Sequence, residues 1–372
     1  MTAVARQAAA DVGARNILLH DFFEICGGGE RLSLVLSKGL DLDLCYGFWT
    51  PESYDPVERE DITTFDLNAY SSVGGWRTLK QMMAFRRKTR FIRGYNKVIY
   101  SGVGSPLAVH NHPHGENIFY CHTPPRFIYD QHEFYLTQLP KWQQPLLQAL
   151  VTTVKPMYEA AVDQMDVIVA NSSNVQRRIK HFLGKDAQVV YPPADTQRFS
   201  WRGQHGYYLS TARLDRLKRV ELVIRAFMQM PTKRLIVASG GSESERLRKI
   251  AVGAPNIGFT GWVSDRRLRS LLGGAIATLY VPRDEDFGMS PVESMAAGKP
   301  VIAAGSGGLQ ETVVDGETGT LLPADPTVDD IVEAVEELPP QRALAMRSTC
   351  EARSQEFSTE TFLSRMKAVI DG

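Results

Sequence analysis

Two charged clusters in the C-terminal half of the chain have the residue types and spacing needed to bind a diphosphate and a sugar. In the first cluster, Arg213 lies near the end of GYYLSTARL, an apolar run typical of a strand, and Lys218 follows this run. Cations after a parallel strand face the crevice in which such folds bind ligands. An arginine fork and a lysine point charge both suit a diphosphate. A solvated basic loop is the structural alternative for this cluster.

The second cluster extends from Glu285 to Glu293. Between the two glutamates lies a loop whose glycine allows a ligand to approach the backbone closely; the loop consists of Phe287, Gly288, Met289 and Ser290. We expect a helix to start here, with Ser290 as its N-cap and Glu293 in its first turn. A carboxylate at that position can accept both hydroxyls of a ribose, and free N–H groups can bind a phosphate. Alternatively, Glu293 only complements the helix dipole.

The N-terminal half contributes a glycine turn and a histidine. Gly27 and Gly28 lie between the apolar run NILLHDF and a segment of helical periodicity, so a phosphate or sugar can approach the backbone there. His122 ends the run IFYCH, directly before Thr-Pro-Pro, which predicts a position at the carboxyl end of a strand. Glycine turns also serve packing, and a lone histidine is more often structural, so both features keep a structural alternative.

The segment 76–97 is basic and lies within a longer stretch, 67–115, that contains no Asp or Glu. Aromatic and apolar residues alternate there with cations, which include Arg86, Arg87, Lys88, Arg90 and Arg93. This pattern suits an anionic membrane surface or a lipid-linked substrate. A solvated face and a site for substrate phosphates remain open alternatives. We expect no nucleic-acid partner, because no nucleic-acid motif accompanies the segment.

These residues require a scaffold of parallel strands, and the chain has the pattern of two such scaffolds. Short apolar runs alternate with helical periodicity on both sides of VVYPPADTQRF, where two prolines end a strand. A length of 372 residues also suits two domains. We therefore expect Rossmann-like α/β domains at residues 1–192 and 193–355, followed by a last helix within 356–372 with Ser358 as its N-cap.

Composition argues against several other classes of protein. Lys plus Arg and Asp plus Glu each number 42, so there is no overall charge to attract nucleic acid. The four cysteines form no CxxC pair, which argues against a zinc knuckle and a disulfide scaffold and suits a reducing compartment. The first residues lack an apolar signal region, and no run approaches the ~18 apolar residues of a membrane span. We expect a cytoplasmic protein.

Several motifs, in order, resemble those of glycosyltransferase family 4, the retaining enzymes of the GT-B fold. The motifs are GGGER, YCHTPPRFIYD, YPPADTQRF, STARLDRLKRVELVIRAF, GFTGWVSD, the E-x7-E pair Glu285 and Glu293, and PVIAAGSGGLQETVVDGETG. They cover nearly the whole chain and look closest to bacterial mannosyltransferases of O-antigen and exopolysaccharide assembly. Two positions depart from the family pattern: Gly29 replaces an alanine, and Pro125 replaces a methionine.

The resemblance implies a GT-B fold, in which two parallel sheets face each other across a cleft and a C-terminal helix crosses back to the N-terminal domain. It implies retaining transfer of a hexosyl group to a glycan or lipid-linked acceptor in surface polysaccharide synthesis. The expected donor is GDP-mannose, which supplies a mannosyl group. The protein would be peripheral on the inner face of the cell membrane. We expect no metal or other cofactor.

The resemblance also implies roles for single residues. Arg213 and Lys218 would bind the donor diphosphate, and Glu293 would bind the ribose. The backbone of Val263 would contact the base. Glu285 would lie at the sugar and its phosphates, together with the loop of Phe287, Gly288, Met289 and Ser290. His122 would lie near the transferred sugar, and Gly27 and Gly28 would lie on the acceptor side near the phosphates.

The sequence leaves four alternatives open. The same fold can use a UDP- or dTDP-sugar donor, or a small soluble acceptor. It can also perform the chemistry of a sugar phosphorylase or a sugar-phosphate synthase. A degenerate, non-catalytic glycosyltransferase would be expected to lose a cation or a motif glutamate. A dinucleotide-binding oxidoreductase would be expected to carry GxGxxG with an acidic residue ~20 positions on, and neither half of the chain contains that pair.

Overall fold

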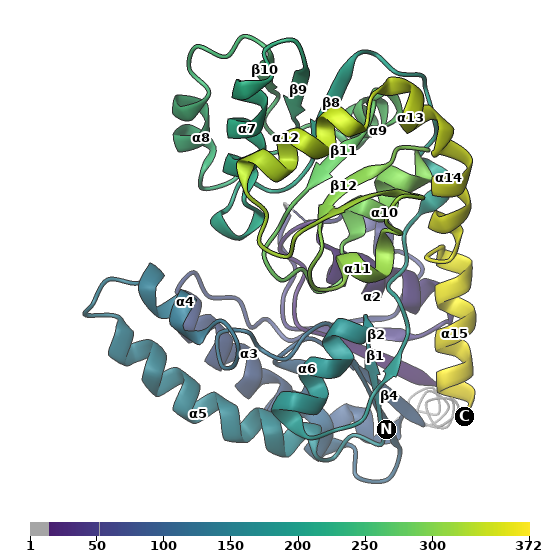
Figure 1. Ribbon diagram of the computed structural model, residues 1–372. Coiled ribbons are helices and arrows are strands. Elements are labelled where there is room, and N and C mark those ends of the chain that lie inside the picture. Colours follow the sequence, from purple (N-terminus) through teal and green to yellow (C-terminus); the bar gives the residue numbers. More distant parts are fainter. Residues whose placement is uncertain (1–14, 52) are drawn as a thin grey trace. The chain divides into compact units, whose positions relative to one another are not determined.

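The computed structural model describes residues 15–51 and 53–372, which form two compact units (Figure 1). The N-terminal unit contains the chain up to Pro192 together with Leu363–Gly372, and the C-terminal unit contains Pro193–Phe362. Each unit has its own β-sheet, and every strand pairing recorded within these two sheets is parallel. The predicted pair of Rossmann-like α/β scaffolds is confirmed.

The sheet of the N-terminal unit has seven strands in the order β3-β2-β1-β4-β5-β6-β7. Its strands are β1 (Asn16–His20), β2 (Asp43–Tyr46), β3 (Thr64–Asp66), β4 (Lys97–Ser101), β5 (Glu116–Cys121), β6 (Val167–Ala170) and β7 (Gln188–Val189). The order reverses between β1 and β4. The carboxyl ends of strands at such a reversal are where open α/β sheets bind ligands.

Helices pack around this sheet, and the last part of the C-terminal helix is one of them. The helices are α2 (Gly28–Gly39), α3 (Gly74–Lys88), α4 (His132–Gln138), α5 (Gln144–Val162), α6 (Ser173–Leu183) and the last part of α15 (Thr359–Asp371). Leu363 of α15 lies directly on Gly39, where an added Cβ would come within 2.5 Å of it. The Nζ of Lys97 donates to the carbonyl of Ile370 in the same helix. The end of α15 is thus part of the N-terminal unit.

The sheet of the C-terminal unit has six strands in the order β10-β9-β8-β11-β12-β13, so its order reverses between β8 and β11. Its strands are β8 (Tyr207–Ser210), β9 (Arg234–Val237), β10 (Ile257–Phe259), β11 (Thr278–Tyr280), β12 (Val301–Ala304) and β13 (Gly319–Leu322). The helices packed around them are α7 (Val220–Gln229), α8 (Ser244–Ile250), α9 (Asp265–Gly274), α10 (Met289–Ala296), α11 (Leu309–Thr312), α12 (Val328–Glu337), α13 (Pro340–Ala345) and α14 (Arg347–Gln355).

The apolar spacing of RVELVIRAFMQM predicts a helix with one hydrophobic face, and this prediction is confirmed. Val220, Val223, Ile224 and Phe227 of α7 are all buried. The predicted N-cap of the last helix is also confirmed, because the backbone N–H of Thr361 donates to Oγ of Ser358 at 3.2 Å. Periodic apolar residues and a capping serine are local signals, which explains why the sequence predicts these two features well.

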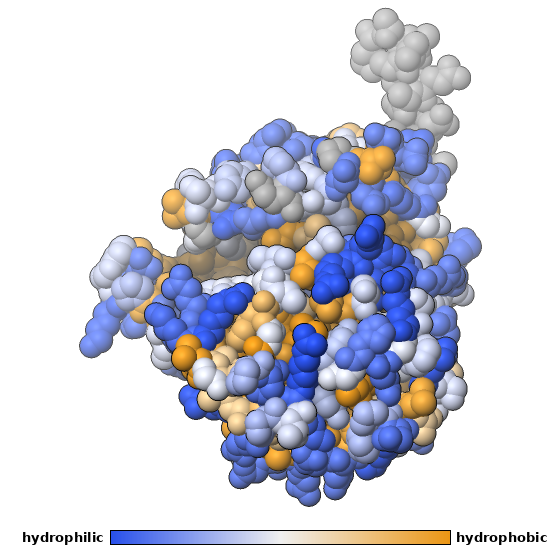
Figure 2. Space-filling model, turned by 90° about the horizontal axis from the view of Figure 1, so that it is seen from above, coloured by the Kyte–Doolittle hydropathy of each residue, from blue (hydrophilic) through white to orange (hydrophobic). Residues whose placement is uncertain are grey.

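Hydrophilic residues cover most of the face shown in Figure 2, and hydrophobic residues gather in patches between them. Within the described residues, no helix combines the length and the hydropathy needed to cross a bilayer. The four cysteines are free thiols; Cys26 is exposed, and Cys45, Cys121 and Cys350 are buried.

Candidate active site

Loops at the carboxyl edge of the C-terminal unit's sheet carry most of the predicted donor-binding residues. The loop after β8 holds Arg213 and Lys218, and the loop after β11 holds Glu285. β8 and β11 are the two strands between which the strand order reverses. These residues therefore lie at the position where the topology of an open α/β sheet places a ligand.

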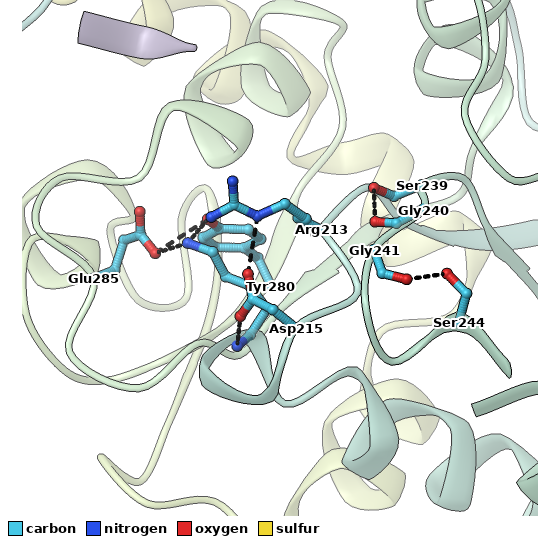
Figure 3. Close-up of polar contacts among 9 residues, drawn as sticks. Arg213, Asp215, Ser239, Gly240, Gly241, Ser244, Tyr280 and Glu285 are labelled. Carbon is cyan, nitrogen blue, oxygen red and sulfur yellow. Dashed lines mark hydrogen bonds and ion pairs between the residues drawn. The ribbon is translucent and has the colours of Figure 1, made fainter. Parts of the chain in front are cut away.

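Lys218 and Glu285 form an ion pair in this loop region. The Nζ of Lys218 lies 2.6 Å from Oε2 of Glu285 and 3.1 Å from the hydroxyl of Tyr280, which itself donates to Oε2 of Glu285 at 3.1 Å (Figure 3). The Lys218 and Glu285 side chains are only 19% and 18% exposed. Burial lowers the pKa of Lys218, but Tyr280 and Glu285 more than offset this and raise it above the ordinary value, so the lysine is charged.

Arg213 is anchored beside this pair by Asp215. Its Nε donates to Oδ2 of Asp215 at 2.9 Å, and Oδ1 of Asp215 accepts the backbone N–H of Lys218 at 3.1 Å (Figure 3). One carboxylate thus fixes both the arginine and the short 3-10 helix Arg216–Lys218. The Arg213 side chain remains 54% exposed and can contact a ligand.

The loop after β9 packs against the Arg213 loop, and the loop after β10 packs against the loop after β9. The backbone N–H of Leu214 donates to the carbonyl of Gly240 at 2.9 Å, and a Cβ on Gly241 would come within 2.3 Å of the Leu214 carbonyl. The exposed ring of Trp262 lies on Gly240, where a Cβ would come within 2.5 Å of its indole nitrogen. Val263 therefore directly follows Trp262, which contacts Gly240 in the turn beside the Arg213 loop.

The loop that begins at Glu285 leads into α10, and the structure corrects the prediction for this helix start. The N-cap is Gly288 with φ of +98°, not Ser290. A glycine can adopt this left-handed conformation at little cost, so the chain enters the helix two residues earlier than predicted. Met289 and Ser290 therefore lie in the first turn, and Glu293, at the fifth helical position, lies beyond it; the prediction of a first-turn glutamate is wrong.

Two glycines of the SGGLQE segment support the Glu285 loop from behind. The backbone N–H of Gly308 donates to the Glu285 carbonyl at 2.9 Å. A Cβ on Gly307 would come within 2.2 Å of the same oxygen, and one on Gly308 within 2.4 Å of the Asp286 carbonyl. The buried ring of Phe287 packs against Phe357 with ring centroids 5.4 Å apart. The Phe287 side chain thus holds the loop in place, and its backbone is the part that can meet a ligand.

The predicted residues of the N-terminal unit lie at the reversal between β1 and β4. Gly27 is the N-cap of α2, and Gly28 is its first residue. His122 follows β5, and its Nε2 lies 2.8 Å from Oγ of Ser101 at the end of β4. That hydroxyl is also 3.0 Å from Nδ1 of His20. Because Ser101 has one hydroxyl proton, it can donate to only one of the two rings and must accept from the other.

Burial keeps both histidines of this cluster neutral. Burial lowers the pKa of His122 to about 4, and burial followed by repulsion from His122 lowers the pKa of His20 to about 3. A Cβ on Gly29 would come within 3.4 Å of the His122 ring. This glycine therefore leaves space beside the ring. The Ser101 hydroxyl orients His122 through a neutral hydrogen bond.

The sequence did not identify Glu30, Tyr280, Ser101 or His20 as site residues. The Glu30 side chain folds back over Gly27, where a Cβ would come within 2.4 Å of its Oε2. Burial, followed by the charges of Glu24 and Asp21, raises the pKa of Glu30 from 4.5 to about 7. A glutamate three residues after a glycine N-cap was a usable signal for Glu30, and a tyrosine at a strand's carboxyl end was one for Tyr280.

The predicted basic residues lie elsewhere in the N-terminal unit. They occupy the last turn of α3 and the 3-10 helix Arg90–Gly94 that follows it. All of them are exposed: Arg86, Arg87, Lys88, Arg90 and Arg93. The Nζ of Lys88 donates to the Leu67 carbonyl. They thus form a cationic surface on other elements than those that carry the glycine turn and His122.

Part of the chain matches a family model. Residues 193–355 match the family model "Glycosyl transferases group 1". The chain is 26% identical over 317 residues to "Alpha-1,3/1,6-mannosyltransferase ALG2" of Rhizomucor pusillus, which covers 68% of this chain and 65% of that protein. It is 30% identical over 226 residues to "D-inositol 3-phosphate glycosyltransferase" of Mycobacterium avium, and this match covers 54% of this chain and 53% of that protein. The chain thus spans less than two thirds of the length of these curated relatives.

Solved structures are similar along nearly the full length. Anabaena Alr3699/HepE, in complex with UDP and glucose, gives a TM-score of 0.73 at 16% identity, with 96% of this chain and 100% of that one covered. Sucrose-phosphate synthase from Thermosynechococcus elongatus gives a TM-score of 0.75 at 18% identity, with 96% of this chain and 98% of that one covered. WaaG, a glycosyltransferase involved in lipopolysaccharide biosynthesis, gives a TM-score of 0.72 at 12% identity, with 96% of this chain and 100% of that one covered. The chain has the GT-B fold that was expected.

Proposed function

We propose that this chain, whose residues 193–355 form a glycosyl transferases group 1 domain, is a retaining glycosyltransferase that moves a hexosyl group from a nucleotide sugar to a glycan or lipid-linked acceptor. The observation that carries the proposal is the charged pair of Lys218 and Glu285, joined by Tyr280, at the strand-order reversal of the matched domain. The proposed role is assembly of a surface polysaccharide.

The proposed chemistry follows from where charge develops. As the bond between the sugar and its phosphate breaks, negative charge accumulates on the leaving diphosphate and positive charge on the sugar. Lys218 and Arg213 bind the diphosphate and stabilise that negative charge. Glu285 and Asp215 hold these cations in position before the donor arrives. Glu293 binds the ribose, and the Val263 backbone meets the base.

Our proposed donor is GDP-mannose, and a UDP- or dTDP-sugar is the alternative. The similarity to mannosyltransferases supports a mannosyl donor, whereas the HepE structure holds UDP and glucose. We propose that the reaction needs no metal, because two fixed cations already neutralise the diphosphate. On the acceptor side, His122 lies near the transferred sugar, and Gly27 and Gly28 line the phosphate region.

The proposed acceptor is borne by a membrane. The exposed cations at the end of α3 suit an anionic lipid surface, so we place the protein on the inner face of the cell membrane. Vesicles of phosphatidylglycerol test this attraction: binding at low salt should weaken in about 0.5 M salt, where the Debye length is only a few ångströms. Equal binding to neutral vesicles would contradict it.

The transfer itself is tested by product analysis. Purified protein is incubated with GDP-mannose, UDP-glucose, UDP-GlcNAc, GDP-fucose or dTDP-rhamnose, each with EDTA and a synthetic polyprenyl-diphosphate glycan. We expect one donor to release its nucleoside diphosphate and to give a glycoside with the donor's anomeric configuration by NMR. An inverted product would overturn the retaining chemistry. Activity only with added Mg²⁺ would overturn the metal independence. No transfer from any donor would overturn the transferase proposal.

A further inference from the structure

An apolar groove of about 920 Å³ lies between α3, α4 and α5 of the N-terminal unit. Figure 1 shows α4 and α5 extending from this unit beside α3. Its wall includes Trp76 and Leu79 of the α3 side, Tyr135 of α4, and Trp142, Leu146 and Leu150 of the α5 side. The volume is at the upper end of the range for small-molecule pockets. The proposed transferase chemistry leaves this groove unused.

The groove differs in composition from an ordinary protein surface. None of its lining residues carries a charge, and from residue 134 to residue 154 the only charged side chain is Lys141. Trp142, Leu146 and Trp76 are nevertheless 71%, 64% and 61% exposed. Contiguous exposed apolar patches on soluble proteins mark sites that bind another molecule or a membrane.

The charges around the groove identify the kind of partner. Over residues 67–115, which contain α3, there is no Asp or Glu. The cations that flank the groove include Lys80 on α3 and Lys141 beside Trp142, both exposed. An anionic partner with an apolar interior satisfies both features at once. Tryptophan and tyrosine rings are also the side chains that favour the boundary between lipid headgroups and hydrocarbon.

We propose that this groove receives the hydrocarbon chains of an anionic lipid layer, with Trp76 and Trp142 at the boundary between headgroups and hydrocarbon. Lys80 and Lys141 contact the headgroups, while Leu146 and the apolar groove floor contact the acyl chains. The inference deepens the proposed membrane-borne acceptor. It adds an apolar, salt-resistant component to the electrostatic attraction of the basic residues at the end of α3.

Quenching of tryptophan fluorescence tests the proposal directly. The probe is a phosphatidylglycerol vesicle with brominated acyl chains, mixed with the full chain in about 0.5 M salt, where surface electrostatics are screened. We expect quenching in the wild type and its loss in Trp142→Phe/Trp76→Phe. In the double variant Trp142→Gln/Leu146→Gln, vesicle affinity should fall about tenfold. Both substituted side chains are exposed, so the fold should be retained. Leu344→Gln, 47% exposed in the C-terminal unit, is the matched control and should bind like the wild type.

Three results would overturn the proposal: absence of quenching in the wild type, unchanged affinity in Trp142→Gln/Leu146→Gln, or a wild-type dimer in light scattering that this variant abolishes. The last result would assign the groove to a second copy of the chain. Vesicle binding is measured without donor or acceptor, and donor hydrolysis is measured without lipid. Failure of the groove proposal is therefore distinguishable from failure of the transferase proposal.

Discussion

At the scale of single residues, the arrangement of Lys218, Tyr280 and Glu285 is set before any donor binds. Their side chains are within 2.6–3.1 Å of one another and largely buried. A cation that is already oriented loses little on reorganisation when charge develops on a leaving group. Buried charge pairs contribute little to stability on average, so we assign this pair to function rather than to folding.

Replacement of Lys218 tests that assignment. We expect Lys218→Ala to lower the turnover of the best donor about 10²–10³-fold, the range seen when one preorganised charge-stabilising group is removed. Arg225→Ala is the matched control, because Arg225 lies in the same unit, on α7, where it pairs with Glu221 and is 50% exposed. Equal effects of the two substitutions on turnover would contradict a specific role for Lys218.

Ser101 is expected to act as a positioning residue for His122. Ser101→Ala removes the hydroxyl that joins the His122 and His20 rings, so we expect kcat to fall about tenfold while the KM of the donor stays unchanged. Ser37→Ala is the control: Ser37 is also buried, but its hydroxyl has no hydrogen-bond partner. Steady-state kinetics and thermal unfolding of both variants check this. A loss of stability without a change in kcat would show a purely structural role.

The buried carboxyl of Glu30 predicts a dependence of stability on pH. Its pKa rises from 4.5 to about 7 on folding, so the folded state holds the proton more tightly than the unfolded state. This contribution to stability is complete below about pH 4.5 and is lost as the pH rises through about 7. Glu30→Gln should therefore stabilise the protein by about 3 kcal/mol at pH 8 and have little effect at pH 4.

Thermal or denaturant unfolding at both pH values checks this prediction. Glu58→Gln is the control, since Glu58 is exposed and pairs with Lys38 at the surface. A stabilisation by Glu30→Gln that is equal at pH 4 and pH 8 would rule out ionisation of Glu30 as its cause.

At the scale of elements, the turn before α11 supports the Glu285 loop through backbone contact. Gly307 and Gly316 both have positive φ, +61° and +76°. A Cβ on Gly307 would meet the Glu285 carbonyl, whereas a Cβ on Gly316 would meet nothing within 4 Å. We expect both alanine variants to lose about 1 kcal/mol of stability from the left-handed backbone.

Only Gly307→Ala should also displace Glu285, and it should therefore weaken binding of the donor at least about tenfold. Calorimetric titration with the donor, together with denaturant unfolding of both variants, checks this. Equal donor affinity in Gly307→Ala and Gly316→Ala would show that the contact with the Glu285 loop is unimportant for the site.

Local features of the elements were predictable from the sequence, and contacts between distant elements were not. The buried face of α7 and the Ser358 cap follow from spacing along one helix. The start of α10 was misplaced because Ser290 is a good N-cap type, whereas the left-handed conformation of Gly288 depends on how the Glu285 loop packs against Gly307 and Gly308.

The same reason explains why part of the candidate site was missed. Ser101 meets His20 because β1 and β4 are neighbouring strands that pair these two residues, although the residues lie 81 positions apart in the sequence. Tyr280 meets Lys218 because β8 and β11 are neighbours across the strand-order reversal. Arg213, Lys218, Glu285 and Glu293 could be proposed from the sequence because each stands in a contiguous motif.

At the scale of the whole molecule, an overall charge of zero conceals an uneven distribution. Lys plus Arg equals Asp plus Glu, at 42 each, yet residues 67–115 contain no acidic side chain. The N-terminal unit therefore carries both the basic surface and the apolar groove, and the C-terminal unit carries the charged pair proposed for the donor. The two proposed tasks, lipid contact and donor binding, are assigned to different units of the fold.

Thermal unfolding with nucleotide sugars tests the central claim most directly. Wild type, Lys218→Ala and Arg225→Ala are heated with each donor of the panel in the presence of EDTA. A donor at 100 times its dissociation constant stabilises the state that binds it by about 2.7 kcal/mol. We predict that one donor, GDP-mannose, raises the unfolding temperature of the wild type and of Arg225→Ala but not of Lys218→Ala. No shift with any donor, or the same shift in all three proteins, would contradict a donor site at Lys218 and Glu285.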